Sequence, residues 1–376
     1  MHIDSDRARL AMDVIDGRPA TGIPTWLINP MEWEMIDRLA GAPPGSYRHD
    51  PIATYTRMQE RSGVCMVDQW IPENPLTIGA HGYESGTDRN ATTGAQRIVA
   101  DGRPIESPED VAAHLEQVAI PRWRGLAESF DANALRENLL RHEADTQAAL
   151  GKVMLKVPYS FPFPVLDYGI YGYEHYFTAY AVYPEVVEQA FAACADYCVL
   201  ANRAAATLFR ERKLLPYARL DHDMASAGGT LVDVTSLDRL WFPHFARSIA
   251  PLIDAGVRAI WHCDGNLMQM VPRLIEAGIQ GFQGFEYEHG MDYTRICRMK
   301  TRDGNPLLIV AGVSVTRTLP HGTPSDVRKE MAWLVENGPK DNLVLGCSSS
   351  IVPGVPWPNL EALVEGFHHY RTTARA

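Results

Sequence analysis

Short apolar runs alternate with longer segments of helical period along most of this chain. The short runs favour β-branched and aromatic residues. The longer segments place apolar residues three and four positions apart, which is typical of amphipathic helices. Eight runs are therefore predicted to be strands. They lie at residues 22–29, 63–70, 152–159, 215–220, 257–260, 280–287, 307–314 and 342–349.

Helical patterns fill most of the gaps between these runs. The clearest span residues 31–39, 131–150, 184–212, 237–255, 267–277 and 358–370, and others start near residues 51 and 107. A strand followed by a helix, repeated, predicts a parallel sheet with right-handed crossovers, and eight such units favour a closed (β/α)8 TIM barrel. An open doubly wound sheet is the alternative, but the chain has no glycine-rich nucleotide-binding motif.

We therefore predict an α/β protein whose residues 1–376 form a single TIM-barrel domain. Residues 76–104 interrupt the rhythm with many Gly, Thr and Asp, and they are predicted to be an insertion at one rim of the barrel. Within this insertion, residues 98–103 have the pattern of half a hairpin.

Composition narrows the class of protein. The 376 residues are 46% hydrophobic, which allows a large core, and 35 basic against 46 acidic residues give a net charge of −11. This charge argues against nucleic-acid binding. The polar N-terminus does not read as a signal peptide, no apolar run has membrane-spanning length, and six cysteines show no paired framework. We expect a cytoplasmic protein that binds neither nucleic acid nor membrane.

The most informative stretch is Trp261-His262-Cys263-Asp264-Gly265-Asn266, which follows the fifth apolar run and precedes a helical pattern. Side chains alternate along a strand, so His262 and Asp264 share one face and Cys263 takes the other. An imidazole beside a carboxylate suits a metal or proton-transfer site. A buried histidine next to a helix-capping aspartate would produce the same pattern.

The catalytic groups of a TIM barrel come from the carboxyl ends of its strands. That rule gathers one set of polar residues at one mouth: Asp68, Asp221, His222, Asp223, His262, Asp264, Glu286, Glu288, Cys347 and Ser349. Individually, such residues also occur as helix caps or small core residues. Together, histidine, cysteine and carboxylates at one mouth would suit zinc with one coordination position open for substrate.

Several motifs resemble the uroporphyrinogen decarboxylase superfamily. They are His262 through Asn266, Leu274 through Ile279, Gly290-Met291-Asp292, Asp223-Met224-Ala225, Ala311-Gly312-Val313, Gly322-Thr323-Pro324 and Pro353 through Asn359, with looser matches at Gly169 to Tyr173 and Pro184-Glu185. The resemblance implies a (β/α)8 barrel. It also implies one of two chemistries: cofactor-free decarboxylation of uroporphyrinogen, or zinc-dependent methyl transfer between a corrinoid and a thiol or other acceptor.

The departures from this pattern favour the methyltransferase branch. The decarboxylases hold the carboxylates of their substrate with an arginine-rich N-terminal motif, whereas residues 24–35 contain no arginine. Ser349 stands where the decarboxylases place a histidine, although Asp68 matches their essential aspartate. The methyltransferases carry His-x-Cys on the fifth strand, which here is His262-x-Asp264. Their second cysteine falls at Ser349, and Cys347 lies two residues earlier on the same strand face.

The resemblance therefore implies a zinc-dependent methyltransferase that moves a methyl group between a small methylated substrate and a corrinoid or thiol acceptor. A separate protein would carry the corrinoid, and a homodimer is a further expectation. The expected zinc ligands are His262, Asp264, Glu286 and Cys347, the expected catalytic residues are Asp68 and Asp223, and the expected substrate-binding residues are Tyr159, Tyr171, Tyr173, Asn266 and Ser349.

Two other functions remain open on the sequence. One is a metal-free decarboxylase or lyase that acts on a small carboxylic acid, with Asp68 as the acid or electrostatic group. The other is a non-catalytic relative that binds a ligand or a corrinoid protein. Metal content and a response to methyl donors distinguish these functions from the methyltransferase.

The substrate is expected to be small and weakly charged or aromatic. An aromatic loop over residues 159–173 would close over it, or would pack as a lid without selectivity. The only cations near the inferred mouth are Lys156, Arg219 and Arg317, and Arg219 lies on the Asp221 face of its strand, where internal pairing is expected. A substrate with many carboxylates would need more fixed cations than this.

Overall fold

The computed structural model describes residues 5–27, 30–73 and 97–373. Five parallel strands form its main sheet, in the spatial order β11-β10-β9-β8-β5, and two further parallel strands, β1 and β4, pair with each other. The bounds are β1 Met66–Val67, β4 Leu155–Lys156, β5 Tyr217–Asp221, β8 Arg258–His262, β9 Gly281–Gln283, β10 Leu308–Val313 and β11 Leu343–Cys347. Each strand falls within, or overlaps, one of the runs predicted from the sequence.

The first predicted strand joins the two sheets. Thr25 forms a parallel bridge with Leu345 of β11, and its carbonyl accepts a hydrogen bond of 2.9 Å from the backbone N–H of Cys65. On the other side, the Leu155 N–H donates to the Cys65 carbonyl at 2.9 Å. One nearly continuous run of parallel segments therefore extends from β4 through β1, Thr25 and β11 to β5.

The run does not close completely. Among the described residues, no backbone hydrogen bond joins β4 to β5. Pro158 follows β4 and Pro216 precedes β5, and proline has no N–H to donate to a ladder. The fold is thus a mixed α/β, TIM-barrel-like arrangement with a seam between β4 and β5. The fully hydrogen-bonded cylinder expected from the sequence is not seen in this part of the chain.

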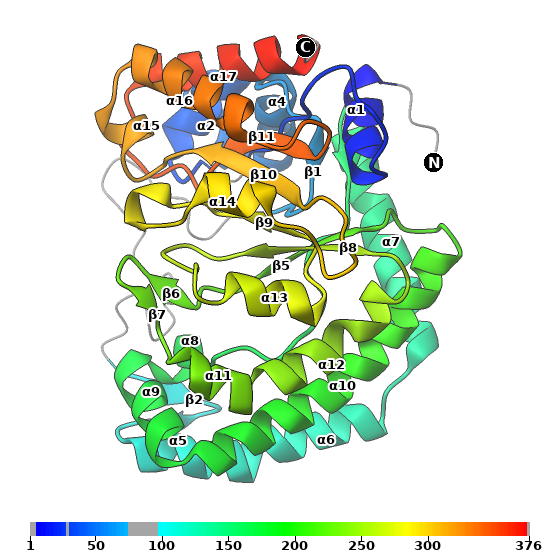
Figure 1. Cartoon of the computed structure of the whole chain (residues 1–376), viewed down its shortest axis with the longest axis vertical. Helices are drawn as coiled ribbons and strands as arrows, with labels where there is room; N and C mark the ends of the chain where they lie inside the picture. The colour runs from blue at the N-terminus through cyan, green and yellow to red at the C-terminus, as the bar shows by residue number, and fades with distance from the viewer. Residues whose placement is uncertain (1–4, 28–29, 74–96, 374–376) are drawn as a thin grey trace.

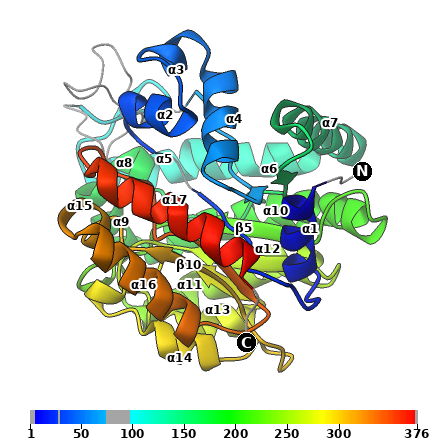
Figure 2. The same ribbon diagram turned by 90° about the horizontal axis from the view of Figure 1, so that it is seen from above.

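Helices surround the strands, with α10 and α12 below them and α16 and α17 above them in Figure 1, and Figure 2 gives the view from above. The longer helices are α1 Asp6–Ile15, α2 Trp33–Ala40, α4 Pro51–Arg61, α6 Ile120–Glu128, α7 Ala132–Leu150, α9 Tyr173–Val182, α10 Pro184–Arg210, α12 Phe242–Ile253, α16 Pro324–Asn337 and α17 Trp357–Thr372. The shorter ones are α3 Ser46–His49, α5 Pro108–His114, α8 Tyr168–Tyr171, α11 Val234–Leu240, α13 Val271–Ala277, α14 Tyr293–Arg298 and α15 Thr318–His321, with a π-helical turn η1 at Leu115–Ala119 and a 3₁₀ turn η2 at Tyr287–His289. None of the described helices is both long and apolar enough to cross a membrane.

A compact core fills the space enclosed by the strands. It contains buried side chains from seven of the eight strand segments, namely Trp26, Cys65, Met66, Leu155, Val157, Tyr217, Ile260, Leu308, Val310 and Val344. The buried face of α1 belongs to the same core. Ser5 starts this helix and donates a hydrogen bond of 2.6 Å to the Val153 carbonyl just before β4. Helix α1 therefore covers the amino-terminal ends of the strands and leaves their carboxyl ends for a site.

The predicted rim insertion lies mostly outside the described residues. Its final part is an antiparallel hairpin of β2 (Val99–Ala100) and β3 (Arg103–Pro104). Asp101 and Gly102 form the turn, both with positive φ, which suits a tight hairpin. A second hairpin, of β6 (Ala225–Ser226) and β7 (Gly229–Thr230), follows β5 at the carboxyl ends of the strands.

Candidate metal centre

Neighbouring strands β5 and β8 bring the central residues together. Their parallel register places Asp221 beside His262, each as the last residue of its strand. Beyond β8 the chain turns sharply at Gly265, whose φ is 82°, and a Cβ there would lie 2.7 Å from the Ser226 carbonyl oxygen. Only glycine fits this close approach without displacing the β6–β7 hairpin. The turn keeps Asp264 next to His262.

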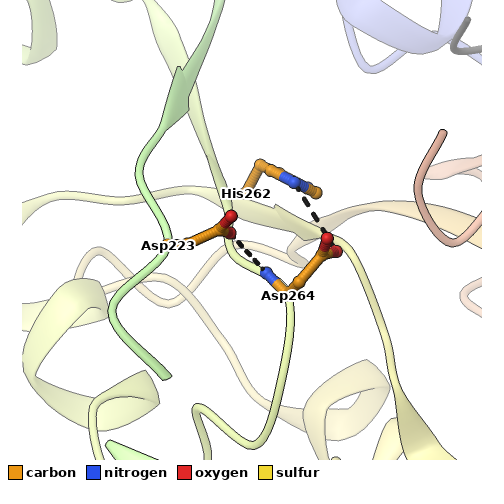
Figure 3. A group of neighbouring side chains, drawn as sticks. All are labelled: Asp223, His262 and Asp264. Carbon is orange, nitrogen blue, oxygen red and sulfur yellow. Dashed lines mark hydrogen bonds and ion pairs between the residues drawn. The ribbon is translucent and has the colours of Figure 1, made fainter. Parts of the chain in front are cut away.

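Asp223, His262 and Asp264 form a cluster in which one potential ligand atom from each residue lies within 4.8 Å of the others. The residues extend from the ends of the two strands toward a common point (Figure 3). His262 is 5% exposed, and its Nε2 lies 3.7 Å from Asp264 Oδ1. Both His262 Nδ1 and Asp264 Oδ1 are buried without a hydrogen-bond partner among the described residues. His262 faces Asp264 with its Nε2, so of these two atoms it is Asp264 Oδ1 that an external partner within the cluster would satisfy.

The other polar atoms of Asp264 have partners. Its Oδ2 accepts a hydrogen bond of 3.0 Å from Ser349 Oγ, and its backbone N–H donates to Asp223 Oδ1 at 2.8 Å. The pKa of Asp264 is raised to about 6, mainly by burial and also by the charges of Asp223 and Glu286, against the opposite effect of His262 and Ser349. The centre thus holds more negative charge than its own cations neutralise.

A buried network lies directly behind the cluster. The Arg219 guanidinium donates from Nε to Asp68 Oδ2 at 2.7 Å and from Nη1 to Asp221 Oδ2 at 2.8 Å. Tyr159 donates its hydroxyl proton to the same Asp221 oxygen at 2.8 Å. Asp221 Oδ1 carries neither bond and lies 3.9 Å from His262 Nε2. Burial opposes ionisation of Asp221, but His262, Arg219 and Tyr159 outweigh it and lower the pKa of Asp221.

Asp68, predicted to be catalytic, is enclosed by this network. Its Oδ1 accepts hydrogen bonds from the indole N–H of Trp26 at 2.9 Å and from the Gln69 backbone at 2.6 Å, and its Oδ2 faces Arg219. Burial raises its pKa, but the Arg219 charge and these bonds dominate, so the net effect is a lowered pKa. Asp68 is therefore held as a carboxylate whose two oxygens are both engaged.

Two of the four predicted metal ligands lie outside the cluster. Glu286 Oε2 accepts hydrogen bonds of 2.9 Å from the Gly265 backbone N–H and from His289 Nδ1. Cys347 is fully buried in the hydrophobic core at the end of β11, where burial raises the pKa of its thiol. Its Sγ is not among the potential ligand atoms that lie close together at the cluster. Asp223, predicted to be catalytic, takes a place among the potential ligands instead.

The predicted substrate-binding residues have separate environments. Tyr159 belongs to the Arg219 network and Ser349 binds Asp264, as described above. Tyr171 is buried, with its hydroxyl 2.9 Å from His114 Nδ1. Tyr173 is 49% exposed at the start of α9, and Asn266 accepts a hydrogen bond of 3.2 Å from the Met268 N–H. The structure therefore gathers Tyr159 and Ser349 around the cluster but not Tyr171.

Tyr168 and His222 complete the surroundings of Asp223. The Tyr168 hydroxyl donates to the Asp223 carbonyl at 2.7 Å, and its ring stacks on His222 with 5.5 Å between centroids. His222 Nε2 accepts a hydrogen bond of 2.9 Å from the Leu166 N–H, which places the proton of the neutral ring on Nδ1. Burial lowers the pKa of His222 to about 4. The sequence marked the strand end at His222, but nothing distinguished Tyr168 from the other aromatic residues of its loop.

Comparison with known proteins agrees with the fold. No family model matches the sequence. No curated protein matches it either. Among solved structures, the chain is similar to a methyltransferase from Methanosarcina mazei, with a TM-score of 0.60 and 15% sequence identity over 98% of this chain and 99% of that chain. At this identity the similarity establishes a shared fold along the whole length of both chains.

Proposed function

We propose that this chain is a metal-dependent methyltransferase with zinc at the Asp223–His262–Asp264 cluster. The observation that carries the proposal is the three-residue group itself at the carboxyl ends of parallel strands, whose ligand atoms lie within 4.8 Å of one another and whose Asp264 Oδ1 is buried without a hydrogen-bond partner among the described residues. The shared fold with a methyltransferase supports methyl transfer as the reaction. We further propose that the chain belongs to the uroporphyrinogen decarboxylase superfamily, with the β4–β5 seam as a local departure from its closed barrel.

The residues fit a zinc ion. Two ligands of a tetrahedral zinc, each about 2.1 Å from the metal, lie roughly 3.4 Å apart. The His262 Nε2 to Asp264 Oδ1 separation is 3.7 Å, close to this value, and Asp223 has a ligand atom within 4.8 Å of both residues. The donor set of one imidazole and two carboxylates is harder than a thiolate site and agrees with replacement of the expected cysteine by Asp264. Three protein ligands would leave a position open for substrate.

When bound, zinc would act as a Lewis acid that lowers the pKa of a thiol acceptor or polarises the oxygen of a methyl ether. Neighbouring side chains of the protein orient the carboxylates around the metal position. Arg219 and Tyr159 both bind Asp221 Oδ2, which leaves Oδ1 free to accept a proton or hydrogen bond from the substrate. Ser349 orients Asp264 through its Oδ2, so that Oδ1 faces His262.

The charges of the site favour a small substrate with few carboxylates. Asp221, Asp223 and Asp264 all surround the imidazole. Arg219 is already paired with two carboxylates, as expected from the sequence, and Lys156 is paired with Glu143 at 2.9 Å. Of the three cations expected near the mouth, only Arg317 has no ion pair among the described residues, so a substrate with several carboxylates would enter a negative environment with few cations to hold it. A weakly charged or aromatic methylated compound fits better.

A corrinoid on a separate protein is our proposed methyl carrier. A metal-free decarboxylase or lyase with Asp68 as its acid is less well supported. Asp68 is held as a carboxylate by Arg219 and Trp26 and has no proton to give.

The test is a spectral assay with free cobalamin in its cob(I) and methylated states. The purified protein is incubated with panels of methyl ethers, methylamines and methylthiols, and with thiol acceptors. We expect a change between the cob(I) and methyl spectra with at least one compound, and loss of that change in His262→Ala. Decarboxylation of uroporphyrinogen with no response to any methyl compound would overturn the proposal.

A further inference from the structure

A second cavity lies at the opposite end of the strands from His262. Its volume is about 590 Å³, and it opens beside the starts of β5 and β8, whereas the metal cluster lies at their ends. Its lining includes Asp16, Arg18, Arg210, Arg212 and Arg258. This volume is in the usual range of small-molecule sites.

Four arginines line this cavity against one carboxylate. Arg18 pairs with Asp16 and with Asp13, both at 2.8 Å. The other three arginines have no carboxylate within ion-pair distance in the part of the chain that the structure describes. In a chain with a net charge of −11, this is a local concentration of unneutralised positive charge.

Arg258 is the innermost of the three. Its Nη1 donates to the carbonyls of Val14 and Ile15 at 2.8 and 3.1 Å, and its Nη2 donates to Asn342 Oδ1 at 2.8 Å. All three acceptors are neutral, so these bonds orient the guanidinium without cancelling its charge. Burial lowers its pKa to about 10, which still leaves it charged at neutral pH.

Arg210 and Arg212 project from the end of α10. Basic residues at a helix C-terminus often bind its last carbonyls, but neither guanidinium donates a hydrogen bond to any described residue. Arg212 has a φ of 58°, in the left-handed region where glycine is normally preferred after a helix. The backbone N–H groups of Arg212 and Lys213 donate to the carbonyls of Phe209 and Leu208 at 3.0 and 2.9 Å, so this conformation is the left-handed end of the helix and leaves both arginine side chains outside it.

We propose that this cavity binds a compact polyanion carrying at least two phosphate or carboxylate groups. The guanidinium presents paired N–H donors that match the oxygens of either group, and several guanidiniums around one cavity can bind a ligand with more than one anionic group. Phosphate is the better match, since its oxygens point in more directions toward arginines from different elements. This site is independent of the metal centre and of the proposed methyl transfer.

The test is calorimetric titration of the full-length protein with pyrophosphate and, separately, with citrate, against NaCl of matched ionic strength. We expect saturable binding of at least one anion, weakened about tenfold or more in the double variant Arg210→Gln/Arg212→Asn because two charge-assisted contacts are lost. Asparagine is chosen because it tolerates a positive φ. Arg203→Gln, on the exposed side of the same helix, should bind as the wild type does.

The relative affinities of the two anions distinguish a phosphorylated natural ligand from a polycarboxylate. Tighter binding of pyrophosphate identifies a phosphorylated ligand, and tighter binding of citrate identifies a polycarboxylate. Absence of saturable binding for both anions would overturn the proposal. So would equal affinities of the wild type, the double variant and the single variant Arg210→Gln.

Discussion

Arg219 and Asp68 form a buried ion pair across the seam between β4 and β5. The Nε to Oδ2 distance is 2.7 Å, and the two side chains are 0% and 1% exposed. Asp68 follows β1, which pairs with β4, and Arg219 lies in β5. The pair therefore joins the two sheets where no backbone hydrogen bonds do. Arg219 also holds Asp221 beside His262, through the ion pair between Arg219 Nη1 and Asp221 Oδ2.

Asp68→Asn should destabilise the fold strongly. It leaves the buried Arg219 with one carboxylate instead of two, and removal of one partner from a buried pair costs about 3–5 kcal/mol. The measurement is the free energy of unfolding in urea. Asp196→Asn is the matched control, because it breaks an exposed pair with Arg247 of the same 2.7 Å length and should cost under about 1 kcal/mol. Similar losses in both variants would show that Asp68 does not hold the seam.

Glu330 should make the stability of the protein depend on pH. Burial raises the pKa of Glu330 to about 7, although a hydrogen bond of 2.7 Å from the Ser314 N–H opposes the shift. The folded protein then binds a proton at Glu330 more tightly than the unfolded chain does, so stability falls as pH rises from about 4.3 toward 7.

The variant Glu330→Gln keeps an acceptor for Ser314 and removes this titration. The free energy of unfolding of both proteins is measured in urea between pH 5 and 7. As pH rises, the variant should become more stable relative to the wild type, by at most about 1.4 kcal/mol per pH unit. A constant difference across this range would mean that Glu330 titrates normally.

Asp221 should matter for turnover more than for metal binding. Its free Oδ1 is the carboxylate oxygen nearest the imidazole that is not assigned to the metal. Asp221→Asn should lower kcat for methyl transfer by about a hundredfold or more, as for loss of a general base, with the bound metal unchanged. The variant Tyr159→Phe removes one hydrogen bond to Asp221 but leaves the charge of that carboxylate. It should lower kcat by less than about tenfold. Equal effects of the two variants would argue against proton transfer at Oδ1.

The periodicity of the chain was enough to locate the strands of the two parallel sheets, because each of them lies in a short apolar run bounded by turns or prolines. It could not show the seam. There, Pro158 and Pro216 limit β4 and β5, and a side-chain pair between Asp68 and Arg219, 151 positions apart, joins the sheets instead. Sequence patterns report local preference, whereas such a pair depends on the folded geometry.

The general location of the site was also predictable from local sequence patterns. The alternation of side chains placed His262 and Asp264 on one face, and the structure shows them 3.7 Å apart. Asp221 and Asp223 were recognised as strand-end residues, but their separate partners depend on the β5–β8 register and on the Gly265 turn. The direction of Cys347 into the core could not be read from its strand position, since the residue two positions later, Ser349, binds Asp264.

The metal content of the purified protein tests the central proposal most directly. Protein prepared without chelators is analysed by mass spectrometry of its metals, together with His262→Ala, Asp264→Asn, Cys347→Ala and the exposed-histidine control His142→Ala. We expect about one zinc per chain in the wild type, the Cys347 variant and the control. We expect a loss of most of the zinc from the His262 and Asp264 variants, because each removes a ligand of a three-residue site. A wild-type protein without stoichiometric metal, or a His262→Ala variant that retains it, would contradict the proposal.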